Sequence, residues 1–316
     1  GGFMYIADNA YLYKVNAFNV SQEIDRSGSF STLYITGPTV WGDFVYVTSG
    51  STYYQINNSN LSQTIATFSV GGQTWDNPVI YSNEIYFASP NTDKLYKNNA
   101  SNISQNIENV ALTNCNGNIA INDNFIYLGC GSTLYQLNLS NISQTIAQNS
   151  VGAVNNRGGV TIGGGYAYVT ESSTDKVWQL NASDVSQTIA TYSTSGDLQA
   201  AVAYTSDYVY TGTWGGTFYQ LNSSNVSQLI ASVTTGTVYY TPVVSDNHVF
   251  VTTGSGITFQ LNASNVNQII TQISTGGNFN SPTIANGIVY AHSGSTMYQY
   301  GNGAPAVTLN SPEDNY

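Results

Sequence analysis

One segment recurs along the whole chain and determines how it can fold. It first occurs at Leu12–Ile24, and every copy carries an aromatic residue at the same position. These aromatic residues are Tyr13, Tyr54, Tyr96, Tyr135, Trp178, Tyr219, Phe259 and Tyr298. Neighbouring copies are 39 to 43 residues apart. In a chain of strand-like segments, a period near forty predicts a β-propeller, in which each repeat forms one blade.

The seventh copy shows the strands of one repeat most clearly. Four runs alternate between apolar and polar residues and are separated by turns rich in Gly, Asn and Ser. They are Thr241–Val244, His248–Thr252, Ile257–Leu261 and Asn267–Ile273. This alternation is typical of strands, and no segment has convincing helical periodicity. We therefore expect an all-β chain with about four antiparallel strands per repeat.

The two ends of the chain depart from the repeat. Six copies, from Gly37 to Gly276, carry all four strands, whereas the first opens on its second strand, Phe3–Ile6. The last copy carries its first three strands and leaves the pattern at residues 301–303. We predict one eight-bladed propeller over residues 1–303, with residues 304–316 as a linker or closing strand. Because the sequence begins inside a repeat and shows no signal peptide, we expect that upstream residues were removed.

Charge is scarce and mostly negative. Of the 316 residues only 7% are charged, and six Lys or Arg against seventeen Asp or Glu give a net charge of -11. Nucleic-acid binding requires clustered basic residues, and so does docking on anionic lipid, so we expect neither. No stretch of eighteen apolar residues occurs, so no membrane insertion is expected.

The repeats resemble those of quinoprotein-type, or PQQ-like, β-propellers. The matching residues are Thr241-Pro242 and Ser281-Pro282 at the first strand, the Val-Tyr-Val pattern of the second strand, and Leu-Tyr-Gln-Leu-Asn of the third. The family's usual Asp-Ala-x-Thr-Gly turn is replaced by Asn-Ala-Ser-Asn, and the Trp of its fourth strand is missing. In its place stand Ile24, Ile65, Ile107, Ile146, Ile189, Ile230 and Ile270. The resemblance therefore implies the fold, but no quinone, calcium or other cofactor and no enzymatic activity.

The C-terminal residues carry a second, shorter resemblance. Residues 304–316 are similar to the opening strand of bacterial immunoglobulin-like surface repeats, which read Pro-x-Val-x-Leu-x-Ser-Pro. This resemblance implies that the chain is one module of a longer surface protein, with neighbouring modules among its partners.

The two cysteines are placed symmetrically about a predicted turn. Cys115 and Cys130 flank a hairpin whose centre is at Asn122-Asp123. Residues opposite each other in such a hairpin have Cβ atoms about 4.5–5.5 Å apart, which is near disulfide reach. We predict a disulfide and hence an oxidising compartment. The alternative is a pair of buried, reduced thiols.

Asn-x-Ser sequons gather at the turn between the third and fourth strands. They begin at Asn19, Asn57, Asn60, Asn99, Asn102, Asn138, Asn141, Asn181, Asn222, Asn225 and Asn262. Exposed sequons in a secreted protein are candidate glycan acceptors. The alternative is that the Asn and Ser side chains simply satisfy the backbone groups of the turn.

Some loop positions differ from repeat to repeat where the scaffold positions stay uniform. They lie at the entry to the first strand or in the turn between the second and third strands, and should surround the mouth of the central channel. The candidate ligand-binding residues are Trp75, Asp76, Arg157, Gln199, Trp214, Tyr239, Tyr240 and Phe279. Aromatic and polar side chains together suit sugars or peptides. The alternative is free drift of loop residues.

Catalytic and metal motifs are not found in the sequence. His248 and His292 stand at opposite ends of their strands, and there is no Cys-x-x-Cys, HExxH or Gly-x-Ser-x-Gly spacing. The acids Glu171 and Asp175 share one turn and are best explained as solvated loop residues. We expect no catalytic residues and no metal site.

Together these features predict a non-catalytic extracellular module for recognition, adhesion or scaffolding, with other surface proteins or glycans as partners. A cell-surface or virion location is expected. One alternative is a lectin that binds glycans with the channel-mouth aromatics. Another is a carbohydrate-active enzyme, either a lyase or a glycosidase, that uses converging carboxylates such as Asp76, Glu171, Asp175 and Asp207.

Overall fold

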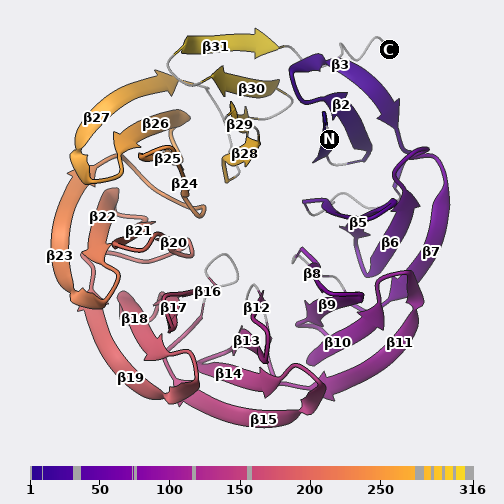
Figure 1. Cartoon of the computed structure of the whole chain (residues 1–316), viewed down its shortest axis with the longest axis horizontal. Coiled ribbons are helices and arrows are strands. Elements are labelled where there is room, and N and C mark those ends of the chain that lie inside the picture. Colours follow the sequence, from indigo (N-terminus) through magenta and orange to yellow (C-terminus); the bar gives the residue numbers. More distant parts are fainter. Residues whose placement is uncertain are drawn as a thin grey trace. The chain divides into compact units, whose positions relative to one another are not determined.

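The computed structural model describes most of the chain. The described residues are 2–8, 10–30, 37–72, 74, 77–115, 119–154, 159–274, 281–285, 288–293, 296–301 and 304–309. All regular structure in these ranges is β-strand, so the predicted all-β class is confirmed. The chain forms two compact units, and Figure 1 labels the strands of both. Unit 1 is Gly1–Ile126 with Leu137–Thr145, and unit 2 is Tyr127–Gln136 with Ile146–Tyr316.

Three sheets lie wholly in unit 1, and all pair antiparallel strands. The first has three strands, β1 (Phe3–Ala7), β2 (Leu12–Asn16) and β3 (Asn19–Arg26). The second is β4 (Thr39–Trp41), β5 (Phe44–Ser49), β6 (Thr52–Asn57) and β7 (Thr64–Ser69). The third is β8 (Val79–Tyr81), β9 (Glu84–Ser89), β10 (Lys94–Asn99) and β11 (Asn102–Ala111).

A further sheet consists of β12 (Ala120–Ile121), β13 (Phe125–Cys130), β14 (Thr133–Asn138) and β15 (Asn141–Ser150). Four sheets lie wholly in unit 2. They are β16 (Val160–Gly163), β17 (Tyr166–Glu171), β18 (Lys176–Asn181) and β19 (Asp184–Ser193); β20 (Ala203–Tyr204), β21 (Tyr208–Gly212), β22 (Thr217–Asn222) and β23 (Asn225–Thr234); β24 (Val243–Ser245), β25 (His248–Thr252), β26 (Ile257–Asn262) and β27 (Asn265–Ser274); and β28 (Thr283–Ala285), β29 (Ile288–Ser293), β30 (Thr296–Gly301) and β31 (Ala304–Leu309).

The blade count differs from the prediction. The described residues form seven four-stranded blades, not eight. The first repeat forms the three-stranded sheet β1–β3, because the sequence begins at its second strand and holds no residues for a first one. At the other end, Ala304–Leu309 pairs with β30 as the fourth strand of the last blade.

A buried tyrosine and a buried glutamine connect successive blades. In unit 2, the Tyr168 hydroxyl and the Gln179 side-chain amide both donate to the carbonyl oxygen of Ser223 in the next blade. The Gln179 Oε1 atom accepts the Val226 N–H at 3.0 Å. We call this arrangement the Tyr–Gln contact. It recurs with Tyr46 and Gln55 in unit 1, and with Tyr127 and Gln136, and Tyr210 and Gln220, in unit 2.

Two sheets of unit 1 satisfy the same backbone groups differently. The glutamine position is occupied by Lys14 in the three-stranded sheet β1–β3 and by Lys97 in the β8–β11 blade. The Lys97 Nζ atom donates to the Leu139 carbonyl at 3.2 Å, but a lysine cannot accept an N–H. The Ile142 N–H is instead accepted by Glu108, the cross-strand neighbour of Lys97. We call this the Lys–acid contact.

The three-stranded sheet β1–β3 satisfies the backbone groups of its neighbour in the same way. Lys14 donates to the Asn58 carbonyl at 2.8 Å, while its cross-strand neighbour Asp25 accepts the Leu61 N–H at 2.7 Å. Opposite Gln55, Gln179 and Gln220 in the blades with a Tyr–Gln contact, the cross-strand residue is alanine, as in the pair Gln179 and Ala190. In the sheets described above, backbone groups buried against the next blade are therefore satisfied by one of two matched residue pairs.

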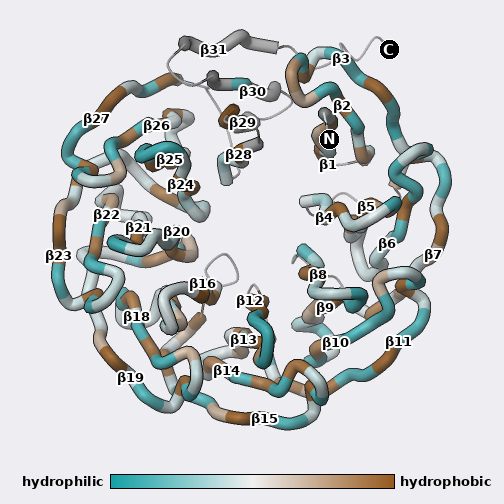
Figure 2. Tube along the Cα trace, in the orientation of Figure 1, coloured by the Kyte–Doolittle hydropathy of each residue, from teal (hydrophilic) through white to brown (hydrophobic). Residues whose placement is uncertain are grey.

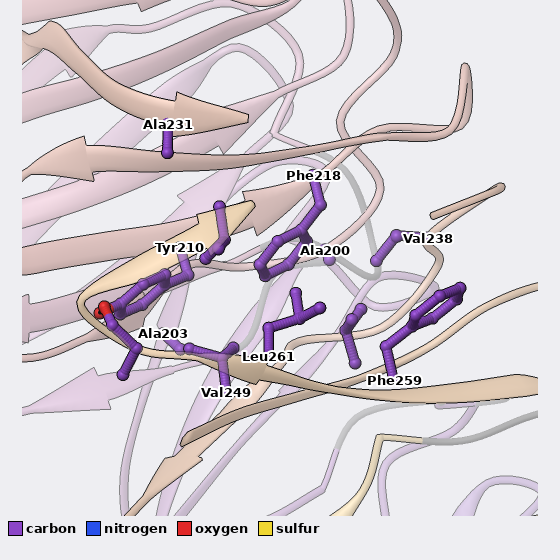
Figure 3. Packing of buried hydrophobic residues seen from close by; sticks show 12 residues of the cluster. Ala200, Ala203, Tyr210, Phe218, Ala231, Val238, Val249, Phe259 and Leu261 are labelled. Atoms are coloured by element: carbon purple, nitrogen blue, oxygen red, sulfur yellow. Dashed lines mark hydrogen bonds between the residues drawn. The ribbon is translucent and has the colours of Figure 1, made fainter. Parts of the chain in front are cut away.

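Apolar side chains fill the space between blades. Figure 3 shows the cluster between the β20–β23 and β24–β27 blades, where Phe218 and Tyr210 pack against Val249, Phe259 and Leu261. Burying a side chain of this size contributes roughly 1.5–3 kcal/mol. The core at this interface thus combines Val and Leu with aromatic residues, among them the third-strand residue Phe259. The more deeply buried aromatics, however, are the second-strand tyrosines, which are almost fully buried.

The fourth strands present a different surface. Figure 2 shows short apolar stretches within the otherwise hydrophilic β19, β23 and β27. The apolar residues there include the exposed Ile189, Ile230 and Ile270. No helix among the described residues has the length and apolar character needed to cross a bilayer.

Candidate functional site

In unit 2, two kinds of loop are hydrogen-bonded to each other. The loop entering each blade contacts the turn between the second and third strands. The Trp214 N–H donates to the Asp197 carbonyl at 2.8 Å, and the Gly254 N–H donates to the Thr237 carbonyl at 2.7 Å. The Thr194 N–H likewise donates to the Asp175 carbonyl at 2.8 Å. These loops and turns therefore lie together at one end of the unit 2 blades.

Trp214, Tyr239 and Tyr240 form an aromatic patch at these loops, in which Trp214 is exposed and the two tyrosines are partly exposed. The Trp214 side chain is 52% exposed, and its ring stands edge-on to Tyr239 with centroids 5.5 Å apart. The rings of Tyr239 and Tyr240 have centroids 6.2 Å apart. Three of the predicted channel-mouth residues are thus brought together.

Close backbone packing fixes the loop that carries the two tyrosines. A Cβ atom on Gly212 would lie only 2.5 Å from Val238, so a glycine lets the loop approach β21. A Cβ atom on Gly254 would lie 2.7 Å from the Tyr239 ring. Because the loop lies directly on these glycines, Tyr239 is held in place before any ligand arrives.

Gln199 is the fourth predicted residue that the structure describes. Its Nε2 atom donates to Asp197 Oδ2 at 2.6 Å, and it is partly buried. The other oxygen of Asp197, Oδ1, is buried and has no hydrogen-bond partner in the described part of the chain. The remaining predicted residues, Trp75, Asp76, Arg157 and Phe279, lie outside the described residues.

Glu171 organises its own turn. The carboxylate is buried and accepts hydrogen bonds from Ser173 N at 2.9 Å, Ser173 Oγ at 2.7 Å, Thr174 N at 3.0 Å and Lys176 N at 3.2 Å, and also from Thr174 Oγ1. Burial alone would raise its pKa, but the hydrogen bonds from Thr174 and Ser173 outweigh burial and lower the pKa. A carboxylate held ionised by its own loop is poorly suited to donate a proton to a substrate.

Asp175 shows the opposite shift. Burial raises its pKa, and the negative charges of Asp197 and Glu171 raise it further. No group of three His, Cys, Asp or Glu side chains in the described ranges could hold a metal ion. His248 packs beside Phe250, with ring centroids 6.2 Å apart, whereas the side chain of His292 is outside the description.

The cysteines and the sequons complete the predicted residues. Cys115 and Cys130 are both disulfide-bonded, which confirms the predicted disulfide. All eleven sequon asparagines are described, and they lie at or beside the turn between the third and fourth strands of their blades.

Sequence reasoning missed the residues that connect the blades. It treated the third-strand aromatics as the anchors, whereas buried tyrosines and glutamines make the hydrogen bonds between blades. A signal was present in the sequence: the residue after the third-strand aromatic is Lys only where the residue eleven positions later is Asp or Glu, as in Lys97 and Glu108. It also missed Asp197, whose carbonyl positions Trp214.

Comparisons with known proteins agree with this fold. The protein-family description that matches residues 150–304 is PQQ_2, outer membrane protein assembly factor BamB. The crystal structure of BamB from Moraxella catarrhalis superposes with a TM-score of 0.74 and 13% sequence identity, covering 93% of this chain and 92% of that one. The computationally designed Ika8 protein gives a TM-score of 0.79 and 9% identity, with coverages of 96% and 94%. No curated protein sequence matches this chain.

At these identities the structural similarity shows the fold and no more. The sheet topology, the repeats and the superpositions agree. The chain is a β-propeller of PQQ-like repeats, similar over residues 150–304 to the family of the outer membrane protein assembly factor BamB.

Proposed function

We propose that the chain is a non-catalytic protein-interaction scaffold that works outside the cytoplasm, and that it binds its partner through the aromatic patch. The observation that carries this proposal is the exposure of Trp214, which is 52% exposed yet held edge-on against Tyr239. Tryptophan and tyrosine dominate the binding energy of protein interfaces. An aromatic ring already held in place loses little conformational freedom when it binds.

The scaffold role also agrees with the similarity to BamB, which is described as an assembly factor. A location outside the cytoplasm is supported by the disulfide, because disulfides persist in oxidising compartments. Within that setting we propose an extracellular, glycosylated module of a larger surface protein. Adhesion and contacts with neighbouring modules are part of this proposal.

A lectin is the second candidate. Trp214 of the aromatic patch is hydrogen-bonded to the loop that carries Asp197 and Gln199, and sugars bind to aromatic faces flanked by such polar groups. A glycan-array signal that is lost in Trp214→Ala would favour the lectin.

A carbohydrate-active enzyme receives less support. The carboxylate of Glu171 is already occupied by donors from its own turn, which leaves Asp175 as the accessible acid of that turn. Cleavage of an oligosaccharide by the wild type, abolished in Asp175→Asn, would support this alternative.

The experiment that tests the scaffold compares two exposed aromatic residues. Phe18, 62% exposed, lies in unit 1 at the turn between β2 and β3 and is not part of the patch. The purified chain is immobilised and exposed to the envelope and extracellular proteins of its own organism. We expect one partner to bind the unmodified chain and Phe18→Ala, and to be lost with Trp214→Ala. Equal binding by all three proteins would refute the patch as the contact surface.

A further inference from the structure

Each turn between a third and a fourth strand carries two sites for asparagine. One lies three residues after the repeated aromatic and the other lies six residues after it. Third-position sequons begin at Asn57, Asn99, Asn138, Asn181, Asn222 and Asn262. Sixth-position sequons begin at Asn19, Asn60, Asn102, Asn141 and Asn225. The sequence motif does not distinguish the two sets, but the structure does.

Five of the six third-position side chains have both ends engaged. In Asn138, Oδ1 accepts the Ser140 N–H at 2.8 Å, and Nδ2 donates to Gln144 Oε1 at 3.0 Å. The same pair of bonds is made by Asn57, Asn99, Asn181 and Asn262. Each of these side chains is only partly exposed. The third-position amide therefore connects the turn to the fourth strand, and its nitrogen is already a donor.

The sixth-position side chains use only their oxygen. In Asn102, Oδ1 accepts both the Ser104 N–H at 3.2 Å and the Ser104 hydroxyl at 2.7 Å. Asn225 does the same with Ser227. The Nδ2 atoms of Asn19, Asn60, Asn102, Asn141 and Asn225 have no partner in the described part of the chain. Asn19, Asn60 and Asn141 are exposed, and Asn102 and Asn225 are partly exposed.

We infer that the sixth-position asparagines are the N-glycan acceptors of the folded chain and that the third-position asparagines bonded to glutamine are structural. The inference depends on the proposed location outside the cytoplasm, where a glycosyl donor is met. In the transfer, Nδ2 bonds to the anomeric carbon of a polyprenyl diphosphate-linked oligosaccharide. The bond from that carbon to the diphosphate oxygen breaks, the lipid diphosphate leaves with the electron pair, and a base of the transferase takes the Nδ2 proton.

Asn222 provides an internal test. It is a third-position asparagine, yet its Nδ2 atom has no hydrogen bond to Gln228 or to any other described group, and only its oxygen is engaged. If a free amide nitrogen decides the outcome, Asn222 must be modified like the sixth-position sites. If position in the turn decides, it must stay unmodified.

The experiment uses the folded chain with an oligosaccharyltransferase that accepts Asn-x-Ser and a polyprenyl diphosphate-linked oligosaccharide. Occupancy is read by mass spectrometry of chymotryptic peptides, since the chain has 25 Tyr but only six Lys or Arg. A synthetic peptide spanning residues 136–146 serves as the unfolded reference, in which Asn138 and Asn141 should be modified alike. In the folded chain we expect Asn141 to exceed Asn138 by at least tenfold.

Two variants test the cause. Gln144→Ala in an Asn141→Gln background frees Asn138 and should raise its occupancy to that of a sixth-position site. Gln228→Ala, at an exposed glutamine that Asn222 does not contact, should change nothing. Equal occupancy of Asn138 and Asn141 in the folded chain would overturn the inference, and so would a folded chain left unmodified beside a modified peptide. Neither result bears on binding at the aromatic patch, so the two proposals fail separately.

Discussion

Replacing one interblade contact by the other is the sharpest test of how the blades are connected. The change is made at Gln179, whose amide donates to the Ser223 carbonyl at 2.9 Å and accepts the Val226 N–H at 3.0 Å. In Gln179→Lys the donor is kept, as Lys97 keeps it in its own blade. The acceptor is lost, and the Val226 N–H is left buried and unpaired.

The expected loss of stability has two causes, the unpaired Val226 N–H and the buried lysine charge. An unpaired buried N–H costs about 1–3 kcal/mol. A buried ammonium without a carboxylate adds a further penalty, because an uncompensated charge in a blade interface is poorly solvated. We therefore expect Gln179→Lys to lower the free energy of unfolding by about 3–5 kcal/mol.

A second substitution should recover most of the free energy of unfolding that Gln179→Lys loses. Ala190 is the cross-strand neighbour of Gln179, as Glu108 is of Lys97. A carboxylate introduced by Ala190→Glu can accept the Val226 N–H, in the way that Glu108 accepts the Ile142 N–H at 3.1 Å. Its negative charge would also attract the new lysine, as Lys97 attracts Glu108 in addition to its direct ion pair with Glu84. On its own Ala190→Glu should cost less stability than Gln179→Lys, because Ala190 is partly exposed although it packs against the neighbouring core cluster.

The assay is urea unfolding of the wild type, both single variants and the double variant. We expect a coupling energy of about 1–3 kcal/mol in favour of the double variant. Gln179→Lys with Thr188→Glu is the control, because Thr188 pairs with Leu180 and is not the cross-strand neighbour of Gln179. A coupling energy near zero, or one equal to that of the control pair, would refute the matched-pair account.

Three further predictions concern the disulfide, an acid and a buried tyrosine. Cys130→Ser opens a loop of roughly fifteen residues and should lower the free energy of unfolding, measured in urea, by about 3 kcal/mol. Independently, the intact mass of the oxidised wild type should rise by two hydrogens on reduction. The lowered pKa of Glu171 means that its contribution is complete above the unfolded value, near 4.5, and is lost as the pH falls through the lower folded value. In Glu171→Gln the free energy of unfolding should therefore fall less steeply between pH 6 and 3 than in the wild type. The same pH dependence in both proteins would show that the hydrogen bonds of the turn to Glu171 do not contribute to stability. Burial raises the pKa of Tyr210 to about 12, so its contribution is complete below pH 10 and is lost between pH 10 and 12. Tyr210→Phe should weaken the alkaline transition, followed by tyrosinate absorbance together with circular dichroism, and an identical transition would show that Tyr210 does not take part.

The sequence was sufficient to predict an all-β propeller because the same pattern of alternating apolar and polar residues occurs in eight copies. The strands of the seventh copy were placed within two residues of β24, β25, β26 and β27. The disulfide was predictable because Cys115 and Cys130 are symmetric about a turn, a relation that depends only on local geometry. The blade count was wrong because it counted the anchor aromatics and not the strands, and the first repeat has residues for only three strands.

The contacts between blades were harder to predict. Gln179 contacts Ser223 and Val226, more than forty residues away, so no local pattern reveals its role. The candidate site was predicted in part. Trp214 and Tyr239 were both predicted as site residues and their rings are in contact, but the contribution of Asp197 depends on a backbone carbonyl, which the identity of the side chain cannot indicate.

The central claim is that the aromatic patch contacts a protein partner, and the most direct test is photocrosslinking at Tyr240 in intact cells or envelopes. A photoreactive amino acid replaces Tyr240, and the chain carries Trp214 or Trp214→Ala, with Phe18→Ala as the matched control. We predict one discrete protein adduct that persists in Phe18→Ala and disappears in Trp214→Ala. The absence of any protein adduct, or an adduct that Trp214→Ala leaves unchanged, would contradict the account.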